Sequence, residues 1–124
     1  MLEFFDDNEK IGVATIYDRH ILFNSKLIKY FDLAYRVRIA VDKELKKIHV
    51  FLIDKDYALS GEVSSSSLLS VSVSKSYVRI ASKNMVKFIQ DSFNLVIDKG
   101  KSVAYKAIYD EIKKEIVIDV GGDD

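Results

Sequence analysis

The chain has 124 residues, and its 19 lysines and arginines balance 19 aspartates and glutamates. The absence of cysteine excludes disulfides, thiolate metal sites and cysteine nucleophiles, and no apolar run reaches the roughly 20 residues of a membrane helix. Because 48% of the residues are apolar and 31% are charged, and because the acidic start lacks the pattern of a signal peptide, we expect one soluble, cytoplasmic domain.

An acidic segment comes first, at residues 1–10, and we expect it to be loosely attached to the rest of the chain. Two short runs of β-prone residues follow, at 13–17 and 20–23, with Asp18 and Arg19 between them. Such runs on either side of a short polar connection are typical of a two-stranded hairpin.

A short helix is predicted after this hairpin. Asn24 or Ser25 can cap it by accepting a backbone N–H hydrogen bond. One face of the helix is apolar, because three large side chains lie three to four residues apart. These side chains are Leu27, Ile28 and Phe31. Two further β-prone runs, 35–41 and 47–53, then predict a second hairpin.

The segment 60–67 has the small and polar residues of a flexible linker. It separates a first unit, residues 11–59, from a second unit, residues 68–120. The second unit begins like the first, because the alternating run 69–73 and the run 77–80 predict another hairpin.

The second unit also continues like the first. Ser82 can cap a helix, and the apolar face of this helix consists of Met85, Phe88 and Ile89. Two β-prone runs, 102–109 and 115–120, predict the closing hairpin. Residues 121–124 form a short acidic tail.

The two units match in pattern. Residues 12–31 can be laid without gaps on 69–88, an offset of 57, so that apolar positions coincide and Ser25 falls on Ser82. Each unit alone is too small to bury both faces of its sheet. We therefore predict a β-rich α+β fold in which two ββαββ repeats share one core, as a pseudo-two-fold, barrel-like or swapped-hairpin domain.

Two short runs bear on the family. The run His20-Ile-Leu-Phe-Asn24 ends a predicted strand, and Phe31-Asp-Leu33 ends the predicted helix. This order of hairpin, short helix and hairpin resembles the AbrB-type swapped-hairpin domain of bacterial transition-state regulators and antitoxins. Two such units in one chain resemble the MraZ type. The resemblance implies a DNA-binding, transcription-regulator-like protein.

In that family the basic residues that contact DNA lie near the strand end and in the first helical turns. At these places the first unit has His20 and Lys29, whereas the second unit has the uncharged Tyr77 and Val86. The signature proline is replaced by Asn24 in the first unit. The resemblance therefore supports the fold more strongly than it supports DNA binding.

The net charge of zero conceals an uneven distribution. Residues 1–10 and 119–124 together hold seven acids and one base, which leaves 18 bases and 12 acids in residues 11–118. A body with an excess of six positive charges is compatible with double-stranded DNA as a partner. The acidic ends could instead bind a basic partner or cover the basic body.

Three pairs of basic residues share a helix or strand face, and they are the predicted DNA-contacting residues. The pairs are Lys26 and Lys29, Arg36 and Arg38, and Lys83 and Lys87. The alternative interpretation is that the lysines only keep the outer helix faces in water. Tyr35, Tyr57 and Tyr105 could stack on bases, although strand tyrosines usually pack beside a core.

Catalytic patterns are weak. The two histidines, His20 and His49, do not form a motif, and zinc sites usually need closely spaced pairs of ligands. Asp54 and Asp56 could hold Mg²⁺ or exchange protons, but this spacing is more typical of a solvated turn. We expect no enzyme, no catalytic residue, no metal, no cofactor and no small-molecule substrate.

The competing function is a protein-interaction or assembly module. Small repeat-built β domains can bind a partner protein or self-associate through exposed strand edges. The scarcity of basic residues at the DNA-contacting positions favours this alternative. A protein of this kind could be an accessory protein of a phage or mobile element.

Overall fold

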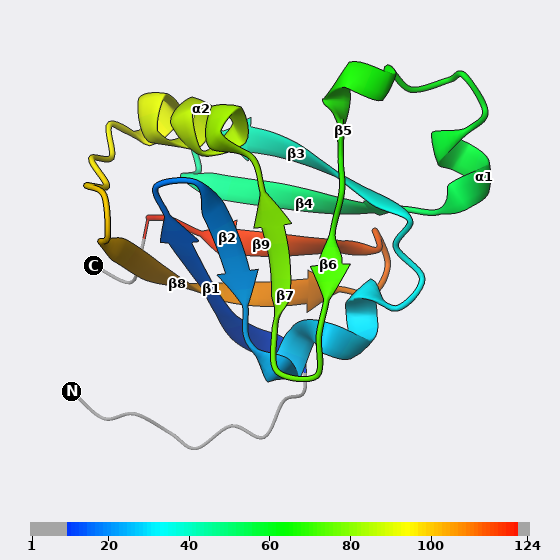
Figure 1. Cartoon of the computed structure of the whole chain (residues 1–124), viewed down its shortest axis with the longest axis horizontal. Helices are drawn as coiled ribbons and strands as arrows, with labels where there is room; N and C mark the ends of the chain where they lie inside the picture. Colours follow the sequence, from blue (N-terminus) through cyan, green and yellow to red (C-terminus); the bar gives the residue numbers. More distant parts are fainter. Residues whose placement is uncertain (1–9, 122–124) are drawn as a thin grey trace.

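A curled antiparallel sheet forms most of the structure, a computed structural model that describes residues 10–121 (Figure 1). The β-rich fold predicted from the sequence is confirmed. Of the acidic ends, the segment 1–9 and residues 122–124 lie outside the described residues. None of the helices in the described part is long and apolar enough to cross a membrane.

Two hairpins and a 3₁₀ helix make up the first part of the chain. In order they are β1 (Ile11–Tyr17), β2 (His20–Phe23), η1 (Ser25–Phe31), β3 (Arg36–Asp42) and β4 (Lys47–Ile53). Both hairpins lie where the alternating β-prone runs predict them. The helix η1 is a 3₁₀ helix, and its N-terminal residue Asn24 makes no side-chain capping hydrogen bond.

The second part is more interrupted. In order it contains α1 (Lys55–Ala58), η2 (Ser65–Ser67), β5 (Leu68–Leu69), β6 (Ser72–Val73), β7 (Val78–Ala81), α2 (Lys83–Phe93), β8 (Ser102–Asp110) and β9 (Glu115–Asp119). The sequence did not predict α1 or η2. Within the predicted linker 60–67, Val63 is buried, so this segment packs against the body instead of being a featureless connection.

The strand order explains why the sheet curls. It runs β5-β3-β4-β9-β8-β1-β2-β7-β6, and every pair is antiparallel. The end strands β5 and β6 belong to one short run of chain, because only Ser70 and Val71 separate them. The single strand predicted at 69–73 is therefore wrong: the run pairs first with β3 and then with β7, and it breaks between them.

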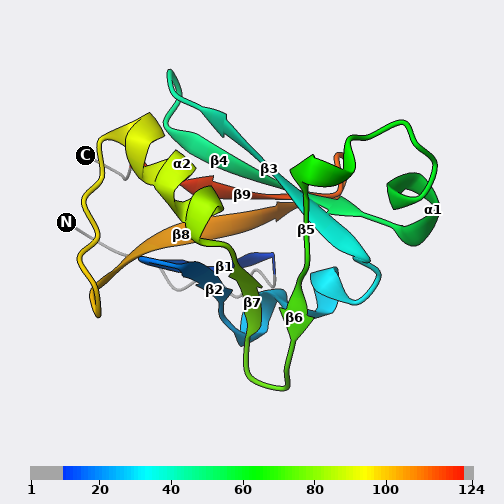
Figure 2. The same cartoon turned by 45° about the horizontal axis from the view of Figure 1, so that its top comes forward.

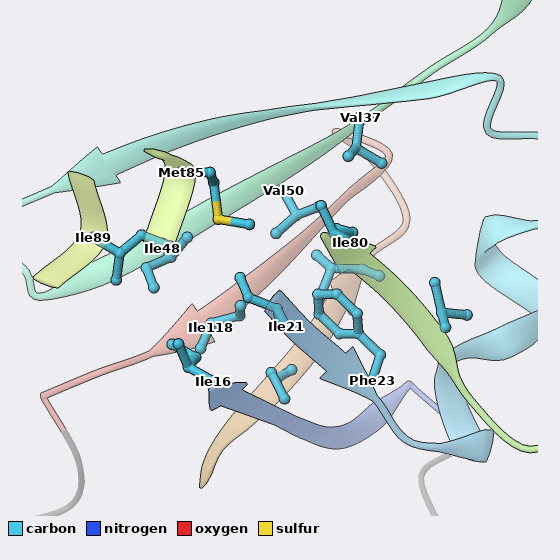
Figure 3. Close-up of a cluster of buried hydrophobic side chains, with 14 of the residues drawn as sticks. Ile16, Ile21, Phe23, Val37, Ile48, Val50, Ile80, Met85, Ile89 and Ile118 are labelled. Atoms are coloured by element: carbon cyan, nitrogen blue, oxygen red, sulfur yellow. The ribbon is translucent and has the colours of Figure 1, made fainter. Parts of the chain in front are cut away.

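One apolar core fills the concave side of the sheet (Figure 3). Side chains alternate along each strand, so that Ile48 and Val50 of β4 point inward while His49 lies on the other face. The neighbouring strand β9, which pairs with β4, repeats this pattern with Ile116 and Ile118. Both parts of the chain therefore contribute to the same core.

The helix α2 adds three buried side chains to this core. They are Met85, Val86 and Ile89. Ser82 caps the helix as predicted, because its Oγ accepts a hydrogen bond from the backbone N–H of Met85 at 3.1 Å. The prediction that Phe88 belongs to the buried face is wrong, since Phe88 is 48% exposed and Val86 is fully buried.

The helix η1 is held against β1 by a close approach at Gly12. A Cβ atom at this position would lie 2.6 Å from Asn24 Oδ1 and 2.6 Å from Leu27 Cγ. The absence of a side chain lets Asn24 Oδ1 accept a hydrogen bond from the N–H of Val13 at 3.2 Å. This bond uses the side-chain oxygen that would otherwise cap the helix, which explains the missing cap.

Replacing Gly12 by Ala should therefore lower the free energy of unfolding by about 1–3 kcal/mol, because the new methyl group overpacks a filled space. Urea denaturation measures this loss. In a Leu27→Ala background the same substitution should cost less, since the Leu27 atoms that it meets are gone. An equal cost in both backgrounds would show that Gly12 does not limit the packing of η1.

The turns of the β3–β4 and β8–β9 hairpins have the same construction. Asp42 Oδ1 accepts a hydrogen bond from the N–H of Leu45 at 2.9 Å, and Asp110 Oδ1 accepts one from the N–H of Lys113 at 3.1 Å. Each turn then ends on a lysine with positive φ, 56° at Lys46 and 52° at Lys114. Left-handed backbone is unfavourable for a residue with a Cβ atom.

Lys46→Gly should accordingly raise the free energy of unfolding by about 1 kcal/mol, as measured by urea denaturation. Lys43→Gly is the matched control, because Lys43 lies in the same turn without a positive φ. Glycine there only adds conformational entropy to the unfolded chain and should lower stability. A loss of stability in both variants would contradict the proposed strain at Lys46.

Candidate nucleic-acid interface

The predicted DNA-contacting residues lie on three different elements. Lys26 and Lys29 are exposed on η1, Lys83 and Lys87 are exposed on α2, and Arg36 and Arg38 lie on β3. Figures 1 and 2 place η1 and α2 at different ends of the curled sheet. The helix lysines therefore do not form one continuous patch.

A cleft lies beside η1, at the end of the sheet where β4 ends and the β8–β9 turn begins. Its volume is about 260 Å³. Its lining residues are Lys29, Tyr30, Leu33, Ala34, Leu52, Asp54, Tyr109 and Lys114. The backbone N–H of Leu52 and the carbonyl of Lys114, 3.5 Å apart, bring the turn against the end of β4. One of the predicted basic residues, Lys29, thus lies in a hollow with a second lysine.

Two stacked tyrosines form one wall of this cleft. The rings of Tyr30 and Tyr109 are 4.0 Å apart between centres, with an angle of 12° between their planes. The Nζ of Lys29 lies 5.3 Å from the centre of the Tyr30 ring, within the range of a cation–π interaction. The stack fixes the position of both rings, because it joins η1 to β8.

A third tyrosine lies next to the cleft, flanked by two cations. The N–H of Tyr35 donates to the carbonyl of Ile53 at 2.9 Å, which places Tyr35 beside the end of β4. The guanidinium of Arg36 lies 4.2 Å from the centre of the Tyr35 ring, and Lys55 Nζ lies 6.0 Å from it. Lys55 directly follows Asp54, which lines the cleft. Tyr35 and its two cations therefore lie at the border of the cleft.

We call these residues together the lysine–tyrosine surface. Its members are Lys29, Tyr30, Tyr35, Arg36, Lys55, Tyr109 and Lys114. Within residues 10–121, Asp54 is the only carboxylate that lines the cleft, and its Oδ1 accepts a hydrogen bond from the backbone N–H of Tyr57 at 2.8 Å as the cap of α1. The surface thus combines four cations with three aromatic rings.

The sequence identified three members of this surface: Lys29, Arg36 and Tyr35. It missed the stack of Tyr30 on Tyr109, since nothing in the sequence pairs these distant positions. The other two tyrosines proposed for stacking lie elsewhere: Tyr57 is exposed on α1, and Tyr105 is half-buried on β8. Burial raises the pKa of Tyr105.

A second polar group lies on the outer face of the sheet. The carboxylate of Glu115 is buried, with 2% of its side chain exposed, and its Oε1 lies 2.8 Å from His49 Nδ1. The ring of Phe51 stacks beside His49 at 6.1 Å. The contact joins β4 to β9 and satisfies the buried carboxylate. Within residues 10–121, no group of three or more potential metal ligands is placed to hold an ion.

His20 occupies the strand end where the family resemblance implies a base. Its ring stacks on Tyr17 with 4.5 Å between the centres. Burial lowers the pKa of His20 below its ordinary value of 6.5, and the nearby positive charge of Arg79 lowers it further, while Asp18 acts in the opposite direction. The imidazole is therefore neutral near pH 7 and does not add to the positive surface.

Arg79→Gln should move the pKa of His20 upward without restoring it to 6.5, because burial, the larger cause, remains. NMR titration of the imidazole C–H signals measures the change, and Arg38→Gln on β3 is the charge-matched control. Because the pKa of His20 is lower in the folded chain than its ordinary value of 6.5, the unfolded chain binds the proton more readily, and the fold loses stability as the pH falls below 6.5. A titration unchanged by Arg79→Gln would show that Arg79 does not act on His20.

Comparisons with protein-family models, with curated proteins and with solved structures give no match for this chain.

Proposed function

We propose that this chain is a non-enzymatic DNA-binding protein and that the lysine–tyrosine surface is its contact with DNA. The observation that carries the proposal is the grouping of four cations around three tyrosine rings at one end of the sheet. Lysine and arginine neutralise phosphates, and exposed aromatic faces can stack on bases.

The charge balance of the described residues supports this proposal. Residues 10–121 contain 19 bases and 13 acids, an excess of six positive charges. Two carboxylates in this region are already engaged: Asp54 caps α1, and Glu111 accepts a hydrogen bond from Lys10 Nζ at 2.7 Å. Both contacts reduce the repulsion that a phosphate backbone would meet there.

We also propose that the chain is built from two ββαββ repeats, at 11–59 and 68–120, with the segment 60–67 between them. At an offset of 57, Thr15 corresponds to Ser72 and Leu22 to Arg79. The strand registers support this offset, since Thr15 faces Leu22 in the hairpin β1–β2 and Ser72 faces Arg79 in the hairpin β6–β7. Leu22 also faces Arg79 across β2 and β7. A pseudo-two-fold axis between the repeats requires such a pairing of equivalent residues.

The closing hairpins agree at a second offset, 68. Asp42 and Lys46 in the first turn have the same roles as Asp110 and Lys114 in the second. The two offsets differ because α2 and the segment after it are longer than η1 and its connection to β3. The repeat supports the resemblance to AbrB-type regulators, and with it a transcription-regulator-like role.

DNA binding is tested by fluorescence anisotropy with a labelled duplex and a labelled single strand of equal length. Both should bind at about 50 mM salt. The affinity should fall steeply towards about 200 mM salt, because the release of counterions from the DNA then contributes less to binding. The double variant Lys29→Glu/Lys114→Glu should weaken binding by about tenfold or more, because each change reverses a phosphate contact.

Lys83→Glu/Lys87→Glu is the matched control, since it changes the net charge equally on α2, at another end of the sheet. If the control weakens binding as much as the first variant, net charge and not the lysine–tyrosine surface attracts DNA. Absence of binding by the unaltered chain at low salt would reject the proposed function altogether. Thermal melting of each variant confirms that the fold is retained.

A further inference from the structure

A groove beside α2 is separate from the lysine–tyrosine surface. Its volume is about 330 Å³. It lies between α2, β3 and the run that contains η2 and β5, and its lining residues are Ile39, Ser66, Ser67, Leu69, Ser82, Asn84, Met85 and Phe88. Among the residues that the structure describes, no carboxylate and no basic group lines it. The groove is therefore an apolar hollow with a rim of hydroxyl and amide groups.

The edge of β3 that borders this groove is only partly paired. On this side β5 pairs with Val37 and Arg38 alone, whereas β4 on the other side pairs with β3 along its full length from Arg36 to Asp42. Among the described residues, no turn or loop makes a backbone hydrogen bond to the part of this edge at 39–42. Such an edge can accept a further strand.

The groove also has an exposed aromatic side chain. Phe88 is 48% exposed, while Met85, one turn earlier on α2, is 6% exposed and belongs to the core. Ile39 and Leu69 are half-buried on the facing strands. An apolar side chain placed on Phe88 would be covered on several sides, which is how strand addition obtains specificity.

The charges next to the groove point to the kind of occupant. Lys83 and Lys87 are exposed on α2 on either side of Met85 in the sequence, and Lys87 has one weak, exposed ion pair with Asp91 at 3.4 Å. Because no carboxylate is among the described residues that line the groove, acidic side chains in an occupant would meet no negative charge in the lining and would be attracted by Lys83 beside it.

We propose that this groove binds an extended, acidic peptide of a partner protein, which adds a strand to the free edge of β3. The peptide backbone bonds to β3 beyond Arg38, alternate apolar side chains cover Phe88 and Leu69, and flanking carboxylates approach Lys83. The protein then presents two surfaces of different chemistry, one for DNA and one for a partner protein.

The probe is the fluorescein-labelled peptide Glu-Asp-Phe-Glu-Leu-Asp-Glu, titrated with the whole chain. Its two apolar residues lie on one face of a strand. We expect saturable binding with a dissociation constant of about 10–100 µM, typical of a short segment that orders on binding. A peptide with serine at both apolar positions should bind at least about fivefold more weakly, since it keeps the charge and loses the apolar contact.

Phe88→Ser should weaken binding of the apolar peptide by about fivefold or more, because it removes the exposed ring. Val96→Ser is its control, since Val96 is 86% exposed and does not line the groove. Lys83→Glu should also weaken binding, and Lys99→Glu should not. Amide NMR signals of residues 39–41 should shift on titration if the peptide pairs with β3.

Equal binding of the apolar and serine peptides, or no saturable binding below about 1 mM, would overturn the proposal. So would loss of affinity in Phe88→Ser without any shift of the signals at 39–41, because strand addition requires contact with that backbone. Phe88 and Lys83 lie outside the lysine–tyrosine surface. The result therefore does not depend on whether the chain binds DNA.

Discussion

Four strand pairs connect the first part of the chain to the second, and the single core depends on them: β1 with β8, β2 with β7, β3 with β5 and β4 with β9. Between β2 and β7 Ile21 lies opposite Ile80, and between β4 and β9 Val50 lies opposite Ile116, all four fully buried. Neither part could bury these side chains alone, because hairpins of the two parts alternate across the curled sheet. Separating the pairs would expose most of the core to water.

The same constraint decides where the helices lie and what remains exposed. The helix η1 packs on β1, β2 and β7, whereas α2 packs on β2 and β3, so the two cover different ends of the core. At the η1 end, Phe31 is buried and the Tyr30–Tyr109 stack closes the packing. At the α2 end, Phe88 stays half exposed beside an open strand edge.

This difference between the two ends provides two distinct surfaces. The lysine–tyrosine surface is rich in cations because the end of β4 and the β8–β9 turn, with its Lys114, both lie at the η1 end. The groove at the α2 end borders an open strand edge, because β5 is short and leaves that edge of β3 without a partner strand beyond Arg38. If the chain is a tandem repeat, its two proposed binding surfaces arise where the repeats depart from symmetry.

The β-prone runs were sufficient to predict the hairpins β1–β2, β3–β4 and β8–β9, because strand preference is a local property. The Ser82 cap was predictable for the same reason. The break between β5 and β6 was not, since it depends on two partner strands that the run 69–73 meets in space. Local periodicity likewise favoured Phe88 over Val86 as a core residue, and only the position of the whole helix against β3 decided otherwise.

For the candidate site, the sequence by itself determined that the body is basic and that Lys29, Arg36 and Tyr35 are suited to a nucleic acid. Only the tertiary structure decided which of them act together. It separated the lysines of η1 from those of α2, and it brought Tyr109, Lys55 and Lys114 to the η1 end. The physical reason is that charge and helix or strand preference belong to single residues and their neighbours, whereas a binding surface depends on long-range strand pairing around a shared core.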